Sequence, residues 1–168
     1  MSSLITSEIR ASATEFYEGN DLCQEKSKCL LKDMNLPNGL LPIQDMEECG
    51  YVKPTGFVWL KSKKKTDHKF EQIGRSVQYS TEVTATIEPG KIKKLTGVKA
   101  KELMLWLTIH EICTDEPDTG KIHFKSTTGL SRTFPISAFV VEEKEEEQKK
   151  EKLANNGEVD VAVAVKEV

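Results

Sequence analysis

Arginine is scarce in this 168-residue chain, where Arg10, Arg75 and Arg132 are the only arginines among 24 basic residues. Arginine recognises phosphates through a planar, bidentate guanidinium, whereas lysine is a strongly hydrated point charge. A basic set dominated by lysine therefore favours solubility over the recognition of phosphates or bases. We expect no nucleic-acid partner.

Long apolar runs are also missing. The segment Met1–Ile5 leads directly into charged residues, so we expect neither a signal peptide nor a membrane-spanning helix. Without a signal, the expected location is cytoplasmic. In that reducing compartment the four cysteines should be free thiols. They are Cys23, Cys29, Cys49 and Cys113.

Motifs for catalysis or cofactor binding are absent as well. The sequence has no glycine-rich phosphate loop and no dinucleotide fingerprint. Ser131 is followed by Thr133, where a Gly-x-Ser-x-Gly elbow needs its second glycine. His68, His110 and His123 could act as bases, and no spacing selects one of them. We expect no catalytic residue and no cofactor, and the interpretation leans against an enzyme.

Two groups of side chains could ligate a metal, but neither has the spacing of a metal site. His110 and Cys113 stand three residues apart, with Cys49 as a candidate third ligand. On a strand, residues three apart point to opposite faces, which argues against a zinc site. The acidic turn 115–120 lacks the spacing of an EF-hand. We therefore expect no bound metal.

The first part of the chain has a helical pattern. Apolar residues recur at helical spacing over residues 4–34 and are interrupted at 19–21, which predicts a kinked helix or a pair of helices. We expect this N-terminal helical segment, residues 1–35, to pack on a sheet. A short helical turn is expected over residues 43–49.

From Tyr51 onward the apolar pattern changes to period two. The turn 53–56 separates two apolar stretches, which predicts a hairpin. Residues 76–87 alternate in the way that is typical of a strand with one wet face. Trp106 lies in a stretch, 102–112, that is apolar on both faces, and we expect it to be buried. Further strands are expected over 70–73, 92–95, 122–124 and 130–134.

Short strands joined by tight turns, with helices at the start of the chain, predict an α+β fold. We expect a mainly antiparallel β barrel-like or sandwich domain over residues 36–141. Residues 142–168 carry nine acids and five lysines. Their first part has no apolar stripe with which to dock, so we expect a flexible, charged C-terminal tail.

Several stretches of this sequence, in this order, resemble the plant family catalogued as Domain of Unknown Function 538. The stretches are LPNGLLP (36–42), TGFVWL (55–60), IEPGKI (87–92), GVKAKEL (97–103), GKIHF (120–124) and TGLSRTFPISAF (128–139). The resemblance covers approximately residues 30–140.

This resemblance implies a land-plant protein with a mostly β fold. Many members of the family look secreted, and this chain departs from them because it lacks a signal peptide and carries a charged tail. Similarity to lipid-binding bactericidal/permeability-increasing proteins and a hydrolase activity have both been suggested for the family. The resemblance supplies no catalytic residues.

Aromatic residues are the candidates for an apolar ligand pocket inside the curved sheet, although a small β domain needs most of its aromatics in the core. The candidates are Tyr51, Phe57, Trp59 and Trp106. A lysine cluster between two expected strands could meet an anionic lipid surface or an acidic partner, or could be a solvated hairpin tip. It consists of Lys61, Lys63, Lys64, Lys65 and Lys69.

We therefore expect a non-enzymatic domain that binds a small apolar or amphipathic ligand between the sheet and the helices. Two alternatives stay open: a protein-interaction or scaffold module with a packed core, and a hydrolase. A cavity would separate ligand binding from the scaffold, and a Ser or Cys near a His in a cleft would favour the hydrolase. We expect a monomer without an integral membrane segment.

Overall fold

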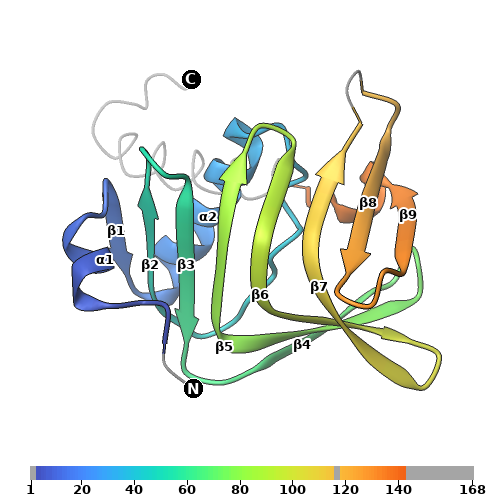
Figure 1. The fold of residues 1–168 in the computed structure, drawn as a ribbon, viewed down its shortest axis with the longest axis horizontal. Helices are drawn as coiled ribbons and strands as arrows, with labels where there is room; N and C mark the ends of the chain where they lie inside the picture. Colours follow the sequence, from blue (N-terminus) through green and yellow to red (C-terminus); the bar gives the residue numbers. More distant parts are fainter. Residues whose placement is uncertain (1–2, 116–117, 143–168) are drawn as a thin grey trace, which may run out of the picture.

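The computed structural model describes residues 3–115 and 118–142 (Figure 1). In this part of the chain a large sheet is accompanied by short helices. The helices are α1 (Ser7–Ala11), α2 (Asn20–Asp33) and the 3-10 helix η1 (Ile136–Phe139). The strands are β1 (Glu15–Glu18), β2 (Met46–Val52), β3 (Phe57–Ser62), β4 (Thr66–Phe70), β5 (Arg75–Glu88), β6 (Lys91–Glu102), β7 (Leu105–Thr114), β8 (Lys121–Ser126) and β9 (Ser131–Pro135).

The strands form one antiparallel sheet in the order β1-β2-β3-β5-β6-β7-β8-β9. Strand β5 is 14 residues long and pairs with two strands on the same side. Strand β4 pairs with the first part of β5, and β3 pairs with its last part. The path runs from β1 to β9 without closing. The expected α+β, mainly antiparallel fold is confirmed.

Two of the expected hairpins are present. The turn 53–56 joins β2 to β3, and a turn after residue 88 joins β5 to β6. The long alternating stretch lies within β5, but its register with β6 shifts on either side of Thr84. Gly97 of β6 has a φ of +83° and lies so close to the backbone of Glu82 that a Cβ would meet its carbonyl oxygen at 2.3 Å. Such irregularities bend the strands they interrupt.

Two segments that were expected to be helical are strands. Residues 15–18 form β1, which pairs with β2, and residues 46–49 belong to β2 instead of forming a helical turn. Four or five residues are too few to distinguish a helical period from alternation. Gly19 has a φ of +97° at the junction of β1 and α2, a conformation that glycine adopts without strain.

Most of the core lies on the face of the sheet that α2 covers, called the inner face below. Leu31 of α2 is buried there together with Leu36, Leu40 and Ile43 of the following segment. The hydroxyl of Tyr79 in β5 donates a hydrogen bond of 3.0 Å to the Leu40 carbonyl. This bond satisfies a polar group that is fully buried and ties the segment to the sheet.

The opposite, outer face of β2 and β3 carries a second, small core. Trp59 has no exposed surface and packs with Val52 and with Ile5 and Ile9 of the N-terminal segment. Its ring lies over Gly50 of the neighbouring strand, where a Cβ would meet ring carbons at 2.2 Å. The N-terminal segment therefore covers the outer face, while α2 covers the inner one.

The expectation that Trp106 is buried is wrong, since this side chain is 41% exposed. The hairpin of β6 and β7 projects beyond the rest of the sheet at the lower right of Figure 1. The apolar neighbours that suggested burial, residues 103–105, are exposed themselves. An apolar pattern shows what a strand could bury, but it does not supply the element that covers it.

The described chain ends beside the segment that follows α2. The Asn38 side chain accepts a hydrogen bond of 2.7 Å from the Val141 N–H and donates one of 3.1 Å to the Val141 carbonyl. The expected charged tail lies outside the described residues from position 143 onward. Among the helices of the described residues, none is long and apolar enough to cross a membrane.

A candidate ligand cleft between α2 and the sheet

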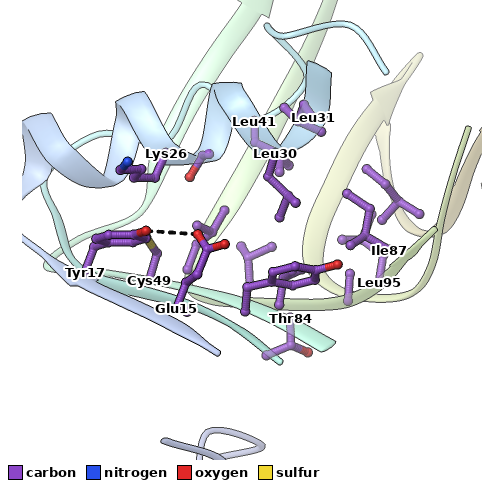
Figure 2. A pocket seen from close by; sticks show the side chains of 18 residues that line it. Glu15, Tyr17, Lys26, Leu30, Leu31, Leu41, Cys49, Thr84, Ile87 and Leu95 are labelled. Carbon is purple, nitrogen blue, oxygen red and sulfur yellow. Dashed lines mark hydrogen bonds between the residues drawn. The ribbon is translucent and has the colours of Figure 1, made fainter. Parts of the chain in front are cut away.

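Helix α2 crosses the sheet without filling all the space beneath it. A cavity of about 50 Å³ lies between α2 and the inner face of β1, β2, β3, β5 and β6 (Figure 2). Most of the residues around it are apolar. They include Leu30, Leu31, Val58, Val83, Ala85 and Ile87. The interior therefore suits a hydrocarbon group and would penalise an ion.

Small side chains on the sheet account for the hollow. Val58 of β3 and Ala85 of β5 are directly paired, so their side chains share the inner face beneath α2. These strand residues form the floor of the cavity, and Leu30 and Leu31 approach it from the helix. Alanine and valine are too short to fill the space that larger residues would occupy at normal packing density.

Polar groups gather at one end of the cavity, which is called the mouth below (Figure 2). The Tyr17 hydroxyl donates a hydrogen bond of 2.9 Å to the Glu15 carboxylate. Lys26 of α2 places its Nζ 5.1 Å from the centroid of the Tyr17 ring. The hydrogen bond to Glu15 raises the pKa of Tyr17 above its ordinary value, so this hydroxyl stays protonated at neutral pH. The mouth thus presents a cation, an anion and a hydroxyl beside an apolar interior.

One hydroxyl on the α2 side of the cavity has no partner. Ser27 Oγ is buried and makes no hydrogen bond within the described part of the chain. Buried hydroxyls are nearly always hydrogen-bonded in folded proteins. A polar atom of a ligand that entered from the mouth would supply the missing partner.

One thiol lines the cavity, and a second thiol lies next to it. Cys49 of β2 lines it and interacts with the Cys23 thiol of α2, which points towards the Tyr17 carbonyl at 3.5 Å. Burial raises the pKa of both thiols above their ordinary value. Since the thiolate is the nucleophilic form, neither cysteine is activated for catalysis.

The four aromatic residues singled out in the sequence lie in three separate places. Tyr51 lines the cavity from β2. Phe57 and Trp59 belong to the outer-face core, where the Trp59 indole N–H donates a hydrogen bond of 2.9 Å to Glu48. Trp106 lies at the projecting hairpin. The structure therefore brings only one of the four to the cleft.

The lysine cluster lies on β3, on β4 and on the connection between these two strands, which both pair with β5. Lys61 is in β3 and Lys69 is in β4, and the three other lysines connect the strands. Those three are exposed, and Lys64 pairs with Asp45 at 3.4 Å. None of the five lines the cleft. Their role in binding an anionic surface stays a prediction.

A hydroxyl, an imidazole and a carboxylate do meet elsewhere in the fold. Thr133 Oγ1 lies 2.8 Å from Nδ1 of His123, and Asp115 Oδ1 lies 2.7 Å from its Nε2. This order of groups is that of a hydrolase triad. Thr133 is exposed on the edge strand β9, however, and lines neither the cleft nor the neighbouring small cavity under β8 and β9. A substrate there would not be shielded from water.

The residues proposed from sequence as weak metal ligands do not meet. His110 Nδ1 is buried without a hydrogen-bond partner, and Cys113 is half-buried further along β7. Within residues 3–115 and 118–142, no group of three His, Cys, Asp or Glu side chains could hold a metal ion.

Sequence reasoning missed the mouth of the cleft. Glu15, Tyr17 and Lys26 all lie in residues 4–34, where a kinked helix or a pair of helices was expected. The break at residues 19–21 indicates where α2 begins, but it does not show that the residues before it pair with β2 as a strand.

Comparisons with known proteins identify one family. The model described as "Protein of unknown function, DUF538" matches residues 27–140. This region includes the floor of the cleft and the second half of α2, while Glu15, Tyr17 and Lys26 precede it. The searches of curated proteins and of solved structures gave no match.

Proposed function

We propose that this chain, which belongs to the DUF538 family of proteins of unknown function, is a non-enzymatic binding domain for a small apolar or amphipathic ligand. The observation that carries the proposal is the apolar cavity beneath α2 with its polar mouth. The ligand's hydrocarbon part would lie between α2 and the sheet, with its polar end at Lys26, Glu15 and the unpaired Ser27 hydroxyl.

The size of the cavity limits how a ligand would bind. An engineered cavity of about 150 Å³ holds benzene, and the cleft has about a third of that volume. A longer chain would therefore have to lift α2 from the sheet. Gly19 before the helix and Asn35 after it both have positive φ values, and these junctions are natural places for such a movement.

The position of the mouth suggests that different parts of the chain bind the apolar part and the polar end of the ligand. The floor lies within the region that matches the family, whereas Glu15, Tyr17 and Lys26 lie before it. We propose that the floor supplies general affinity for apolar groups and that the N-terminal residues select the polar end of the ligand. Plant origin, a cytoplasmic location and a monomeric state stay predictions from the sequence.

Titration with an apolar dye or a fatty acid tests this proposal. We expect saturable binding near one equivalent, because a single cleft is available. Ala85→Leu should abolish binding by filling the floor, at a cost of about 1–3 kcal/mol in stability. Thr81→Leu is the matched control, since Thr81 is exposed on the same strand and lies outside the cleft. The control variant should bind as the parent does.

Two results would contradict ligand binding in the cleft. One is the absence of saturable binding to the parent protein, which would favour the scaffold alternative with a packed core. The other is undiminished binding to a folded Ala85→Leu protein. The hydrolase alternative would require turnover of an ester substrate that is lost in Thr133→Ala, because Thr133 supplies the hydroxyl beside His123.

A further inference from the structure

A second surface, independent of the cleft, lies at the turn between β6 and β7. Residues 103–106, called the β6–β7 tip below, form an exposed apolar run. Leu103 is 85% exposed, Met104 87%, Leu105 66% and Trp106 41%. The tip projects beyond the sheet in Figure 1. Contiguous apolar surface of this kind on a folded protein marks an interaction site.

The chemistry of the turn points the same way. Glu102 is opposite Leu105, so the loop consists of only Leu103 and Met104. Leu103 has a φ of +58°. Two-residue hairpin loops favour Asn, Asp or Gly where φ is positive, and a leucine there is strained. Folding alone would select a different pair of residues, so the apolar tip points to a role outside the fold.

A belt of aromatic and cationic groups lies directly behind the tip. Trp106 is paired across the hairpin with Lys101, whose Nζ lies 5.9 Å from the indole centroid. Lys99 follows on the same strand and is exposed. Tryptophan and lysine are the side chains that anchor proteins where hydrocarbon meets lipid headgroups.

The acid nearest to the tip in sequence is neutralised. Glu102 accepts hydrogen bonds from Arg75 at 2.5 Å and from Arg132 at 2.9 Å. Two guanidinium groups therefore surround one carboxylate. Together with Lys99 and Lys101, they leave the base of the hairpin with an excess of positive charge, which complements an anionic surface.

We propose that the β6–β7 tip inserts into the interfacial layer of an anionic lipid bilayer. A bilayer accepts a convex apolar tip without a matching groove. The order of the side chains matches the layers of a bilayer. Leu103 and Met104 would enter the hydrocarbon boundary, and the Trp106–Lys101 pair would lie at the level of the headgroups. A second copy fits less well. Two tips of four residues each would form only a small contact, whereas stable protein interfaces bury about 1,200 Å² or more.

Sedimentation of the full-length chain with vesicles tests the proposal. We expect binding to phosphatidylcholine vesicles that contain one quarter phosphatidylserine. The double variant Leu103→Asn/Met104→Gly should bind at least about tenfold more weakly, because two apolar side chains are lost. Its Asn-Gly loop suits the turn and should preserve the fold. Lys101→Ala should weaken binding about fivefold.

Leu22→Asn is the matched control. Leu22 is an exposed leucine of α2 that lines neither the tip nor the cleft, so its replacement should leave vesicle binding unchanged. Trp106 fluorescence should shift to the blue with vesicles, and the shift should vanish in Trp106→Phe, because Trp59 is already buried.

Four outcomes would overturn the proposal. One is a parent protein that does not sediment with anionic vesicles, and another is a folded double variant that sediments as well as the parent. A third is equal binding to vesicles of pure phosphatidylcholine, which would show that the negative charge of the lipid is not needed. A parent protein that dimerises without lipid, with a monomeric double variant, would assign the tip to self-association instead.

Discussion

The two tryptophans show how one residue type takes different roles in this fold. Trp59 is enclosed on the outer face, where its ring fits over Gly50 and its N–H bonds to Glu48. The same carboxylate pairs with Arg10 at 2.9 Å, so the N-terminal segment is tied to the buried ring. Trp106 has no comparable enclosure and lies at the exposed hairpin.

Replacement by alanine should separate the two residues clearly. Trp59→Ala should lower the free energy of unfolding by about 3–5 kcal/mol, because it leaves a large cavity. Trp106→Ala should cost less than about 1 kcal/mol, as is usual for surface positions. Urea denaturation followed by circular dichroism measures both. Equal losses would mean that the hairpin is covered in solution.

At the level of elements, an ion-pair cluster fixes the base of the projecting hairpin. Glu102 ends β6, and its two arginine partners come from β5 and β9. The cluster therefore joins three strands at the point where β6 and β7 leave the body of the sheet. The hydrogen bond from Arg132, followed by the charge of Arg75, holds the pKa of Glu102 below its ordinary value.

This lowered pKa predicts a pH dependence of stability. Because the folded pKa lies below the ordinary value of 4.5, the stabilisation is complete above about pH 4.5 and is lost as the pH falls through the lowered folded value. The thermal midpoint of Glu102→Gln should be lower than that of the parent at pH 7. The difference should shrink in acid. A difference that stays constant from pH 7 to pH 3 would show that the carboxylate does not contribute in this way.

At the scale of the whole molecule, two thiols lie at the contact between α2 and the sheet. Cys23 on the helix and Cys49 on β2 are both buried at this junction. Cys29 of α2 is exposed, and Cys113 of β7 is half-buried. The buried pair can therefore report whether α2 separates from the sheet.

Thiol titration should distinguish these environments. In the native protein Cys29 should react first and Cys113 more slowly, while Cys23 and Cys49 should react only when α2 lifts or the protein unfolds, because burial keeps them protonated and inaccessible. In Cys29→Ser the fast phase should disappear. Denatured, unreduced protein should give four thiols. A count of two or fewer would contradict the expectation of reduced cysteines.

Local signals in the sequence predict much of the architecture. Period-two patterns and turn residues predicted the β2–β3 hairpin, the long strand β5 and the turn into β6, since these signals are local. Gly19 indicates the start of α2, but the helical spacing of the apolar residues before it predicts helix where β1 lies. A four-residue strand is stabilised by pairing with β2, a partner more than twenty-five residues away in sequence, and no local pattern contains that information.

The candidate sites depend on contacts between segments that are far apart in the sequence. Tyr51 reaches the cleft while Phe57 and Trp59 face away, because the sheet register assigns them to opposite faces. The cleft exists because short side chains of β3 and β5 happen to lie under α2, and the tip is exposed because β6 and β7 extend past every covering element described. Burial depends on what packs against a residue, and that is a property of segments distant in the chain.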